Sequence, residues 1–231
     1  VCNGPPPMIE PTADIAWALL IATARRLREG IRVAESGDWT GYDSQLLLGH
    51  RLHGGTLLVV GAGRIGAAVA RRAIGWNMRV LYTARTPKPT LEASPISATK
   101  VALEDGLPLA DAVVLTISLD HSTRHLIDAA ALALMKPSSV LVNVSRGPVV
   151  DEIALANALS EKRILGAGLD VYEHEPKIEP RLLDCPNVMV LPHIGSATIE
   201  DRLDLTRLSV ENILAVLTGR KPPHEVTPSE S

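Results

Sequence analysis

The sequence predicts an α/β fold built on a doubly wound parallel sheet. Short β-branched runs alternate with amphipathic stretches over most of the chain, a pattern that is typical of parallel strands joined by helices. The first of these runs passes directly into a glycine-rich turn that opens a helical pattern. A length of 231 residues, of which 46% are hydrophobic and 21% charged, is sufficient for one large sheet and does not indicate disorder.

The chain begins with a segment rich in Gly and Pro that cannot continue a helix, so regular structure is expected to follow it. Thr12 can act as an N-cap with Asp14 in the first turn, and apolar residues then recur at helical spacing until Gly30. We therefore expect a helix over about 12–29. Residues 37–55 contain turn formers and no sustained period, which predicts an arm before the sheet.

From residue 56 onward the alternation becomes regular. Strands are expected at 56–60, 79–82, 100–103, 112–116, 140–143, 167–169 and 188–190. Helices are expected at 65–74, 123–127, 129–135, 153–160 and 198–217.

Charge, hydropathy and cysteine usage argue against several partner classes. A formal net charge of −3 provides no basic field for nucleic acid or an anionic membrane. The longest apolar stretch, Ile15 to Ala24, is about half of what a bilayer span requires. Cys2 and Cys185 form no CxxC motif, and His121 and His125 have no evident third ligand. We expect a cytoplasmic protein without a metal, nucleic-acid or membrane partner.

The turn after the first strand reads Gly61-Ala62-Gly63-Arg64-Ile65-Gly66, which has the spacing GxGxxG. Gly61 permits a tight turn, Gly63 leaves room for a pyrophosphate, and Gly66 lets the helix pack close to the strand. The amides of the first helical residues, including Arg64 and Ile65, would face the phosphates. Between a strand and a helix, this motif predicts a Rossmann-type dinucleotide-binding domain.

The end of the second strand predicts which dinucleotide is bound. An acidic residue there would accept the 2′-hydroxyl of NAD, but the sequence has no carboxylate before Glu92. It has Arg85, Thr86 and Lys88 instead, which suit a 2′-phosphate through charge-assisted contacts. We expect NADP(H) to be preferred, with NAD(H) as the alternative. The same residues are also compatible with a solvated basic loop.

Three further segments follow predicted strands: NVSRG from residue 143, LDVYEHEP from residue 169 and LPHIG from residue 191. The carboxyl ends of parallel strands face one crevice, so an Arg, a carboxylate and a His are expected to meet beside the nicotinamide. These residues are Arg146, Glu175 and His193.

Four segments, GAGRIG, NVSRGPVVDE, GAGLDVYEHEP and LPHIGSAT, together resemble the signatures of the D-isomer-specific 2-hydroxyacid dehydrogenases. Within that family the sequence is most similar to the glyoxylate/hydroxypyruvate reductases. The resemblance implies that His193 gives a proton to the substrate carbonyl oxygen and that Glu175 favours the protonated imidazole. It implies that Arg146 binds the substrate carboxylate and that Ser196 borders the substrate. It also implies cofactor contacts by Thr12, Thr116, Ile117, Val144, Ser145, Asp170, His193 and Gly195.

The sequence departs from the family pattern in two places. Ser118 stands where the family commonly has a proline, and Gly4-Pro5-Pro6 corresponds to the usual TPG of the linker. Family members are usually longer and have a preceding substrate domain. The resemblance therefore implies a linker over 1–11 from a missing substrate-domain segment and a dinucleotide-binding domain over 12–193. It also implies a C-terminal helix over 194–231 that returns to the side of a truncated substrate domain and exposes apolar surface in its absence.

The resemblance implies an oxidoreductase that transfers hydride from NADPH, or NADH, to a small 2-oxoacid such as glyoxylate or hydroxypyruvate and forms the D-2-hydroxyacid. It also implies a homodimer formed through a helical arm at 12–49. The apolar stripe of the helix in this segment is equally compatible with an internal core. The alternative is a catalytically weak dinucleotide-binding interaction protein that resembles the corepressors of the family.

Overall fold

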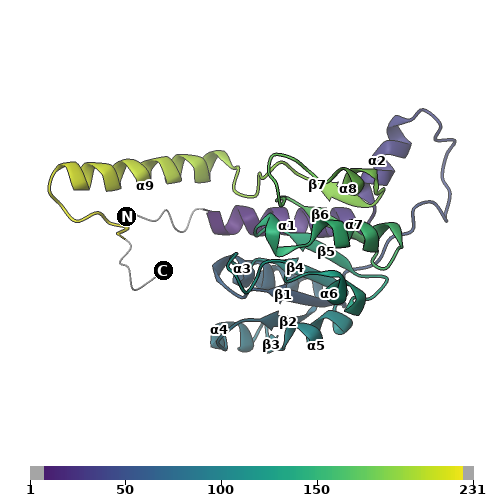
Figure 1. Cartoon of the computed structure of the whole chain (residues 1–231), viewed down its shortest axis with the longest axis horizontal. Coiled ribbons are helices and arrows are strands. Elements are labelled where there is room, and N and C mark those ends of the chain that lie inside the picture. Colours follow the sequence, from purple (N-terminus) through teal and green to yellow (C-terminus); the bar gives the residue numbers. More distant parts are fainter. Residues whose placement is uncertain (1–7, 226–231) are drawn as a thin grey trace.

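A parallel sheet with helices on both faces forms the body of the molecule in the computed structural model, which describes residues 8–225 (Figure 1). Its seven strands have the order β3-β2-β1-β4-β5-β6-β7. The chain winds outward from the centre in both directions because β1 pairs with both β2 and β4. The strands are β1 (Thr56–Val60), β2 (Arg79–Thr83), β3 (Thr99–Lys100), β4 (Ala112–Leu115), β5 (Val140–Asn143), β6 (Gly166–Leu169) and β7 (Val188–Val190).

The register of the sheet brings the carboxyl ends of the strands level with one another. Val60 at the end of β1 lies opposite Thr83 on β2 and Leu115 on β4. Leu115 lies opposite Asn143 on β5, and the alignment continues through β6 to β7. The loops that follow the strands consequently meet at one edge of the sheet, where ligands bind in doubly wound folds.

Two apolar cores lie on the two faces of the sheet, which explains why its central strands are almost continuously apolar. α1 and α3 pack side by side on one face, and α6, α7 and α8 cover the other. The helices are α1 (Ile9–Ala24), α2 (Leu27–Glu35), α3 (Arg64–Arg72), α4 (Pro89–Glu92), α5 (Leu103–Gly106), α6 (Ala129–Leu134), α7 (Glu152–Ser160), α8 (Pro180–Asp184) and α9 (Ile199–Leu217).

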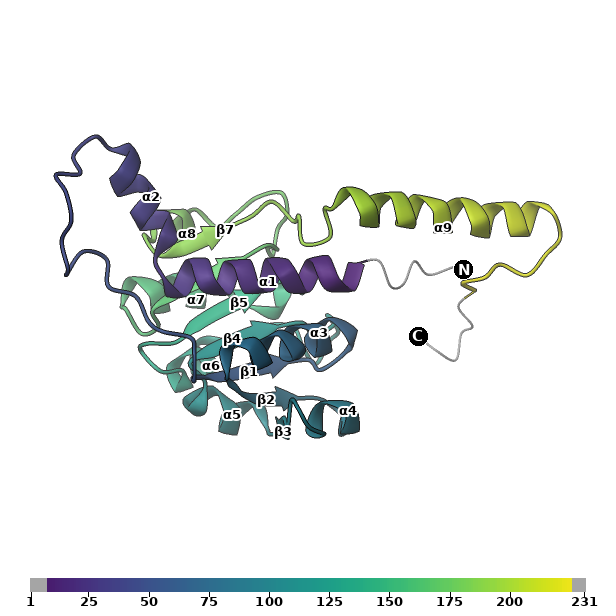
Figure 2. The same ribbon diagram turned by 180° about the vertical axis from the view of Figure 1, so that it is seen from behind.

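Two segments stand away from the sheet, at opposite ends of the molecule (Figures 1 and 2). At one end, α2 and residues 36–49 form a projecting arm. At the other end, α9 extends beyond the body. Both segments expose large apolar side chains: Leu27, Ile31, Trp39, Tyr42, Leu46 and Leu48 on the arm, and Ile199, Leu203, Val210, Ile213, Leu214, Val216 and Leu217 on α9.

The predicted helix over 12–29 is wrong at both ends. α1 begins at Ile9, and Thr12 lies inside it, where its hydroxyl donates a hydrogen bond to the carbonyl oxygen of Met8 instead of capping the helix. Pro11 is tolerated because it lies in the first turn. The helix ends at Ala24, and Arg26 adopts a left-handed φ of 55° before α2 begins.

Two predicted elements are also wrong, and both errors have local causes. Residues 123–127 form turns instead of a helix, because the carboxylate of Asp120 accepts hydrogen bonds from the amides of Ser122 and Thr123. The strand predicted at 100–103 is reduced to β3, since Leu103 already begins α5. The short helices α4, α5 and α8 were not predicted.

The remaining predicted strands and helices agree with the structure to within two residues at each end. Residues 1–7, which include Cys2 and Gly4-Pro5-Pro6, lie outside the described part of the chain. Across residues 8–225, no helix combines the length and the apolar character that crossing a membrane requires. In the same range, no three His, Cys, Asp or Glu side chains gather as metal ligands would.

Candidate active site

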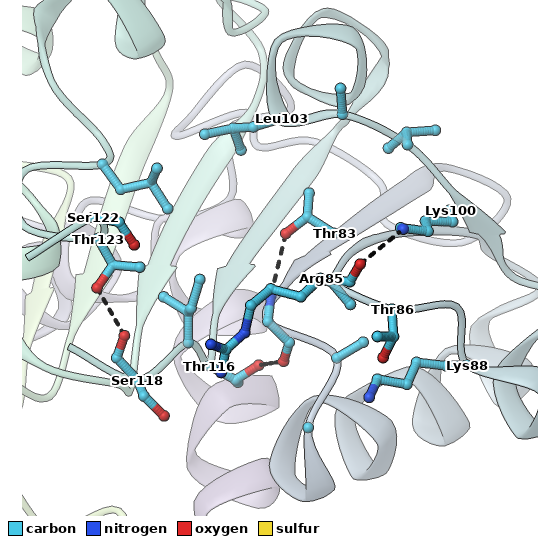
Figure 3. A pocket seen from close by; sticks show the side chains of 18 of the residues that line it. Thr83, Arg85, Thr86, Lys88, Lys100, Leu103, Thr116, Ser118, Ser122 and Thr123 are labelled. Carbon is cyan, nitrogen blue, oxygen red and sulfur yellow. Dashed lines mark hydrogen bonds between the residues drawn. The ribbon is translucent and has the colours of Figure 1, made fainter. Parts of the chain in front are cut away.

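A cavity of about 1040 Å³ opens at the carboxyl ends of β1, β2 and β4 (Figure 3). This is where the strand order reverses, and it is the place where doubly wound folds bind nucleotides. The cavity is lined by Gly61, Ala62, Gly63, Thr83, Ala84, Arg85, Thr86, Lys88, Lys100, Val101, Ala102, Leu103, Thr116, Ile117, Ser118, Asp120, Ser122, Thr123 and Leu126.

The three glycines of the turn after β1 have different surroundings. Gly61 has a φ of +95°, and a Cβ atom there would lie 2.6 Å from the Cα of Ile117. A Cβ atom at Gly66 would lie 2.4 Å from the carbonyl oxygen of Gly61. At Gly63, in contrast, a Cβ atom would meet nothing within 4 Å. The turn therefore leaves open space directly before the N-terminus of α3, which suits the pyrophosphate of a dinucleotide.

One side of the cavity is basic. Arg85, Thr86 and Lys88 come from the loop after β2. In Figure 3, Thr86 and Lys88 lie together, and the Arg85 side chain extends from this loop toward Thr116. Lys100 on β3 joins them, and its Nζ donates to the carbonyl oxygen of Arg85 at 3.3 Å. The carboxylate of Glu92 does not line the cavity, because it accepts the hydroxyl of Tyr82 at 2.5 Å.

The opposite side of the cavity is polar and comes from the loop after β4. The hydroxyl of Thr116 donates to the carbonyl oxygen of Gly61 at 2.7 Å, which attaches this loop to the glycine turn. The hydroxyl of Thr123 donates to the carbonyl oxygen of Ser118 at 2.8 Å (Figure 3). The sequence did not identify Ser118, Asp120, Ser122 and Thr123 as site residues. Their place after a central strand was the one signal that could have identified them.

His193 and Glu175 meet beyond the ends of β7 and β6. Nδ1 of His193 lies 2.8 Å from Oε2 of Glu175, and both side chains are partly exposed. Burial by itself raises the pKa of Glu175. This effect is outweighed by the hydrogen bond with His193, the hydrogen bond from the Tyr172 amide, and the charges of His193 and Arg146, so the pKa lies below its usual range. The arrangement keeps a carboxylate beside the imidazole.

Arg146 lies in the loop after β5, which two interactions hold in place. The side-chain amide of buried Asn143 donates to the carbonyl oxygen of Arg146 at 3.0 Å and also binds Ser145. A Cβ atom at Gly147 would lie only 1.8 Å from the carbonyl carbon of Tyr172. Only glycine permits this backbone contact, which joins the loop of Arg146 to the loop of Glu175.

Asp170 begins the loop after β6 and is nearly fully buried. Its carboxylate oxygens accept the amides of Ile194 and Gly195 at 2.8 and 2.7 Å. Burial raises the pKa of Asp170, although the two amides and the charge of His193 act in the opposite direction. Thr12 belongs to the same group, since a Cβ atom at Gly195 would lie 3.5 Å from its methyl carbon.

The predicted cofactor residues thus fall into separate groups. Gly61, Gly63, Arg85, Thr86, Thr116 and Ile117 line the cavity. Thr12, Asp170, His193 and Gly195 gather beyond β6 and β7, and Ser196 follows them along the chain. Arg64, Ile65 and Gly66 form the first turn of α3. Val144 and Ser145 are buried after β5, where the Ser145 hydroxyl donates to Asn143.

Comparison with known proteins identifies similar sequences and structures. Residues 17–195 match the family model described as "D-isomer specific 2-hydroxyacid dehydrogenase, NAD binding domain". A glyoxylate reductase of Thermococcus onnurineus is 44% identical over 227 residues, which cover 96% of this chain and 68% of that protein.

Two solved structures are similar over 98% of this chain. A protein of Thermus thermophilus has a TM-score of 0.92, 44% identity and 71% of its own chain covered. An NADPH-dependent glyoxylate/hydroxypyruvate reductase of Sinorhizobium meliloti, solved in complex with NADP and malonate, has a TM-score of 0.87, 34% identity and 70% of its chain covered.

Proposed function

Because this chain belongs to the D-isomer-specific 2-hydroxyacid dehydrogenase family, we propose that it reduces a small 2-oxoacid, such as glyoxylate or hydroxypyruvate, to the D-2-hydroxyacid. A reduced nicotinamide dinucleotide supplies the hydride in this reaction. The observation that carries the proposal is the contact between His193 and Glu175, at the same sheet edge as the cavity behind the glycine turn. This pair favours the reductase over a protein that only binds the dinucleotide, since binding alone requires no general acid.

His193 is the proton donor in this proposal, and it neutralises the alkoxide that forms at the substrate carbonyl oxygen. The ionised Glu175 stabilises the protonated imidazole, a role that its lowered pKa supports. Arg146 binds the carboxylate of the 2-oxoacid and polarises its carbonyl group. The charge of Arg146 lowers the pKa of Glu175, which supports a position of Arg146 near the His193–Glu175 pair. Ser196 borders the substrate.

We propose that NADP(H) is preferred over NAD(H). Arg85, Lys88 and Lys100 supply three positive charges at the end of the cavity formed by β2 and β3, and Glu92 is engaged by Tyr82. Changing Arg85→Ser should weaken NADPH binding about ten- to hundredfold, as expected for the loss of a charge-assisted contact, and leave NADH binding within about twofold. Fluorescence titration with both dinucleotides measures this. An equal loss for both would remove the argument for a 2′-phosphate site.

Two further proposals concern the state of the protein. We propose residues 12–49 as the contact surface of a homodimer, supported by the apolar side chains exposed on the arm formed by α2 and residues 36–49. A reducing compartment such as the cytoplasm is proposed from the free thiol of Cys185.

We also propose residues 12–193 as the dinucleotide-binding domain, with the C-terminal helix serving the substrate side.

The proposed reaction is tested by the oxidation of NADPH, followed by absorbance, with glyoxylate and with hydroxypyruvate. The assay uses the 231-residue chain and the full product of its gene, together with the variants His193→Ala and His53→Ala. His53 is an exposed histidine before β1 and serves as the matched control.

We expect His193→Ala to abolish turnover while NADPH affinity stays within about twofold, and His53→Ala to behave as the wild type. If both wild-type proteins bind NADPH and neither turns over a 2-oxoacid, the reductase proposal is rejected. Turnover that survives in His193→Ala would reject His193 as the acid.

A further inference from the structure

The backbone at His193 adopts a conformation that needs external support. Its φ is +56°, a left-handed value that costs free energy for any residue with a Cβ atom. Such conformations persist where neighbouring contacts fix the chain on both sides. After His193, the amides of Ile194 and Gly195 are held by Asp170, as described above.

Before His193, the chain is held by Tyr172. The hydroxyl of this nearly fully buried tyrosine lies 2.7 Å from the carbonyl oxygen of Leu191, two residues before His193, and donates to it. The carbonyl oxygen of Leu169 lies 3.1 Å from the same hydroxyl. Leu191 is further attached to β6, because its amide donates to that carbonyl oxygen at 2.8 Å.

The same tyrosine also holds the partner of His193. Its backbone amide donates to Oε1 of Glu175 at 3.0 Å, while Oε2 of Glu175 contacts the imidazole. One oxygen of the carboxylate is therefore oriented by Tyr172 and the other is directed at His193. Burial raises the pKa of the Tyr172 hydroxyl, and the nearby carboxylates of Asp170, Glu152 and Glu175 raise it further, although its hydrogen bond to Leu191 acts in the opposite direction. The raised pKa keeps the hydroxyl protonated, and therefore a donor, at neutral pH.

We propose that Tyr172 is a positioning residue for proton transfer, because its hydroxyl fixes the chain that carries His193 and its amide fixes Glu175. The proposal rests on the proposed function only for the role of the pair as the proton donor. Tyr172 does not reach the substrate in this account. It acts through the distance and orientation between Nδ1 of His193 and the carboxylate.

The decisive variant is Tyr172→Phe, which removes one oxygen atom and keeps the ring and its buried packing. We expect kcat to fall about tenfold, with KM for the 2-oxoacid and the Kd for NADPH each within about twofold.

In the proton NMR spectrum of Tyr172→Phe, the hydrogen-bonded imidazole N–H of His193 should move upfield or broaden. The pKa of Glu175, followed by carbon NMR, should rise toward the usual glutamate value. The acid limb of the kcat profile should move to higher pH, because the ionised carboxylate is then lost earlier on acidification.

The matched control is Tyr82→Phe, which also removes a buried hydroxyl with a carboxylate partner, on the other side of the cavity from His193. It should leave the His193 resonance and the Glu175 pKa unchanged. The proposal is overturned if Tyr172→Phe also leaves the His193 resonance, the Glu175 pKa and kcat unchanged. It is equally overturned if the only effect of Tyr172→Phe is a lower melting temperature.

A measurement on the wild type covers the case in which Tyr172→Phe does not fold. The amides of Tyr172, Leu191, Ile194 and Gly195 should be protected from hydrogen exchange to a similar degree, because they hold one connected structure. Exchange at the rate of exposed loops would reject the proposal.

The NMR measurements need no 2-oxoacid, so they separate this proposal from the proposed function. A wild type that fails to oxidise NADPH but shows the expected NMR changes on Tyr172→Phe would reject only the reductase.

Discussion

At the scale of single residues, the glycines of the first turn serve separate purposes. Gly66 gives space to the fold, since a side chain there would collide with the backbone of Gly61. At Gly63 nothing in the protein occupies the volume of the missing side chain, and we propose that this space is left for the ligand. The φ of −78° at Gly63 is also one that any residue adopts. The structure agrees with the tight turn predicted at Gly61 and the close packing predicted at Gly66, whereas the role of Gly63 toward a ligand stays a prediction.

The two positions should respond differently to the same substitution. Gly63→Ala should weaken NADPH binding at least tenfold, by roughly the cost of displacing a closely held phosphate, and leave the melting temperature unchanged. Gly66→Ala should destabilise the fold by about 1–3 kcal/mol, as overpacking does. Dinucleotide titration and thermal unfolding of the two variants measure these effects. Equal loss of stability in both would contradict the assignment of Gly63 to the ligand.

Glu152 links burial to the pH dependence of stability. It is nearly fully buried, and its Oε1 accepts the amide of Glu173 at 2.8 Å in the loop that carries Glu175. Burial raises the pKa of Glu152 above its ordinary value of 4.5, although the amides of Glu173 and Glu179 act in the opposite direction. The folded state therefore takes up a proton more readily than the unfolded state does.

It follows that the stabilising contribution of protonated Glu152 is present below pH 4.5 and is lost as the pH rises through the raised pKa. Glu152→Gln removes this titration, so its free energy of unfolding should decline less than that of the wild type over this interval. Urea unfolding at a series of pH values measures both proteins. Parallel curves for the two would show that the pKa of Glu152 is not raised.

Other residue environments could not be inferred from the sequence. The sequence does not distinguish Gly147 from an ordinary turn residue, yet its missing side chain lets the loops of Arg146 and Glu175 touch. Asp170 was expected to contact the cofactor, and the structure adds that both of its oxygens accept backbone amides next to His193. Such contacts join residues far apart in the chain and leave no periodic pattern.

At the scale of elements, the strands were predictable and several helix ends were not. Buried parallel strands are continuous apolar runs bounded by turns, so β1, β5 and β7 have the predicted bounds. The end of α1 has no local signal, because Arg25 and Arg26 are good helix formers. A distant segment accounts for it: the amide of His50 donates to the carbonyl oxygen of Ala24 at 2.9 Å, and Gly49 packs closely against that oxygen.

The arm is anchored to the sheet by one side chain. The guanidinium of Arg28 on α2 donates to the carbonyl oxygen of Val188 at 2.5 Å and approaches two further carbonyl oxygens at the end of α8, those of Leu183 and Cys185. Burial lowers the pKa of Arg28, and the charge of Arg32 lowers it further. This anchor holds the root of the arm on the edge of the sheet while its apolar side chains face outward.

If the arm forms the dimer contact, a charge on its apolar side should separate the subunits. Ile31→Glu should shift the protein to the monomer, because a carboxylate buried in an interface is strongly unfavourable. Ile153→Glu, which makes the same change at an exposed position on α7, outside the arm, is the matched control and should not dissociate the protein. Sedimentation velocity over a range of concentrations measures both. A monomeric wild type, or an Ile31→Glu variant that remains dimeric, would exclude the arm as the contact.

At the scale of the whole molecule, the site combines loops from six strands. The glycine turn and the loops after β2 and β4 form the cavity, and the loops after β5, β6 and β7 carry Arg146, Glu175 and His193. A parallel sheet brings these segments to one edge although 132 positions separate the first from the last, counted from Gly61 to His193. The fold class therefore predicted where the site lies, whereas its internal hydrogen bonds required the structure.

The projecting helix α9 lies apart from the candidate site. α9 extends beyond the sheet (Figure 2), and it exposes large apolar side chains. The cavity and the His193–Glu175 pair lie on the body of the molecule and do not involve those side chains. Dinucleotide binding is thus expected to be independent of what covers α9.

The central claim is that this fold transfers hydride from a reduced nicotinamide to a 2-oxoacid and protonates the resulting alkoxide. The most direct measurement uses NADPH deuterated at both C4 positions, with hydroxypyruvate and the full product of the gene, and analyses the three-carbon hydroxyacid by NMR and chiral separation. The account predicts deuterium at C2 and the D configuration, with neither product nor label in His193→Ala. A product without deuterium, or one of the L configuration, would contradict it.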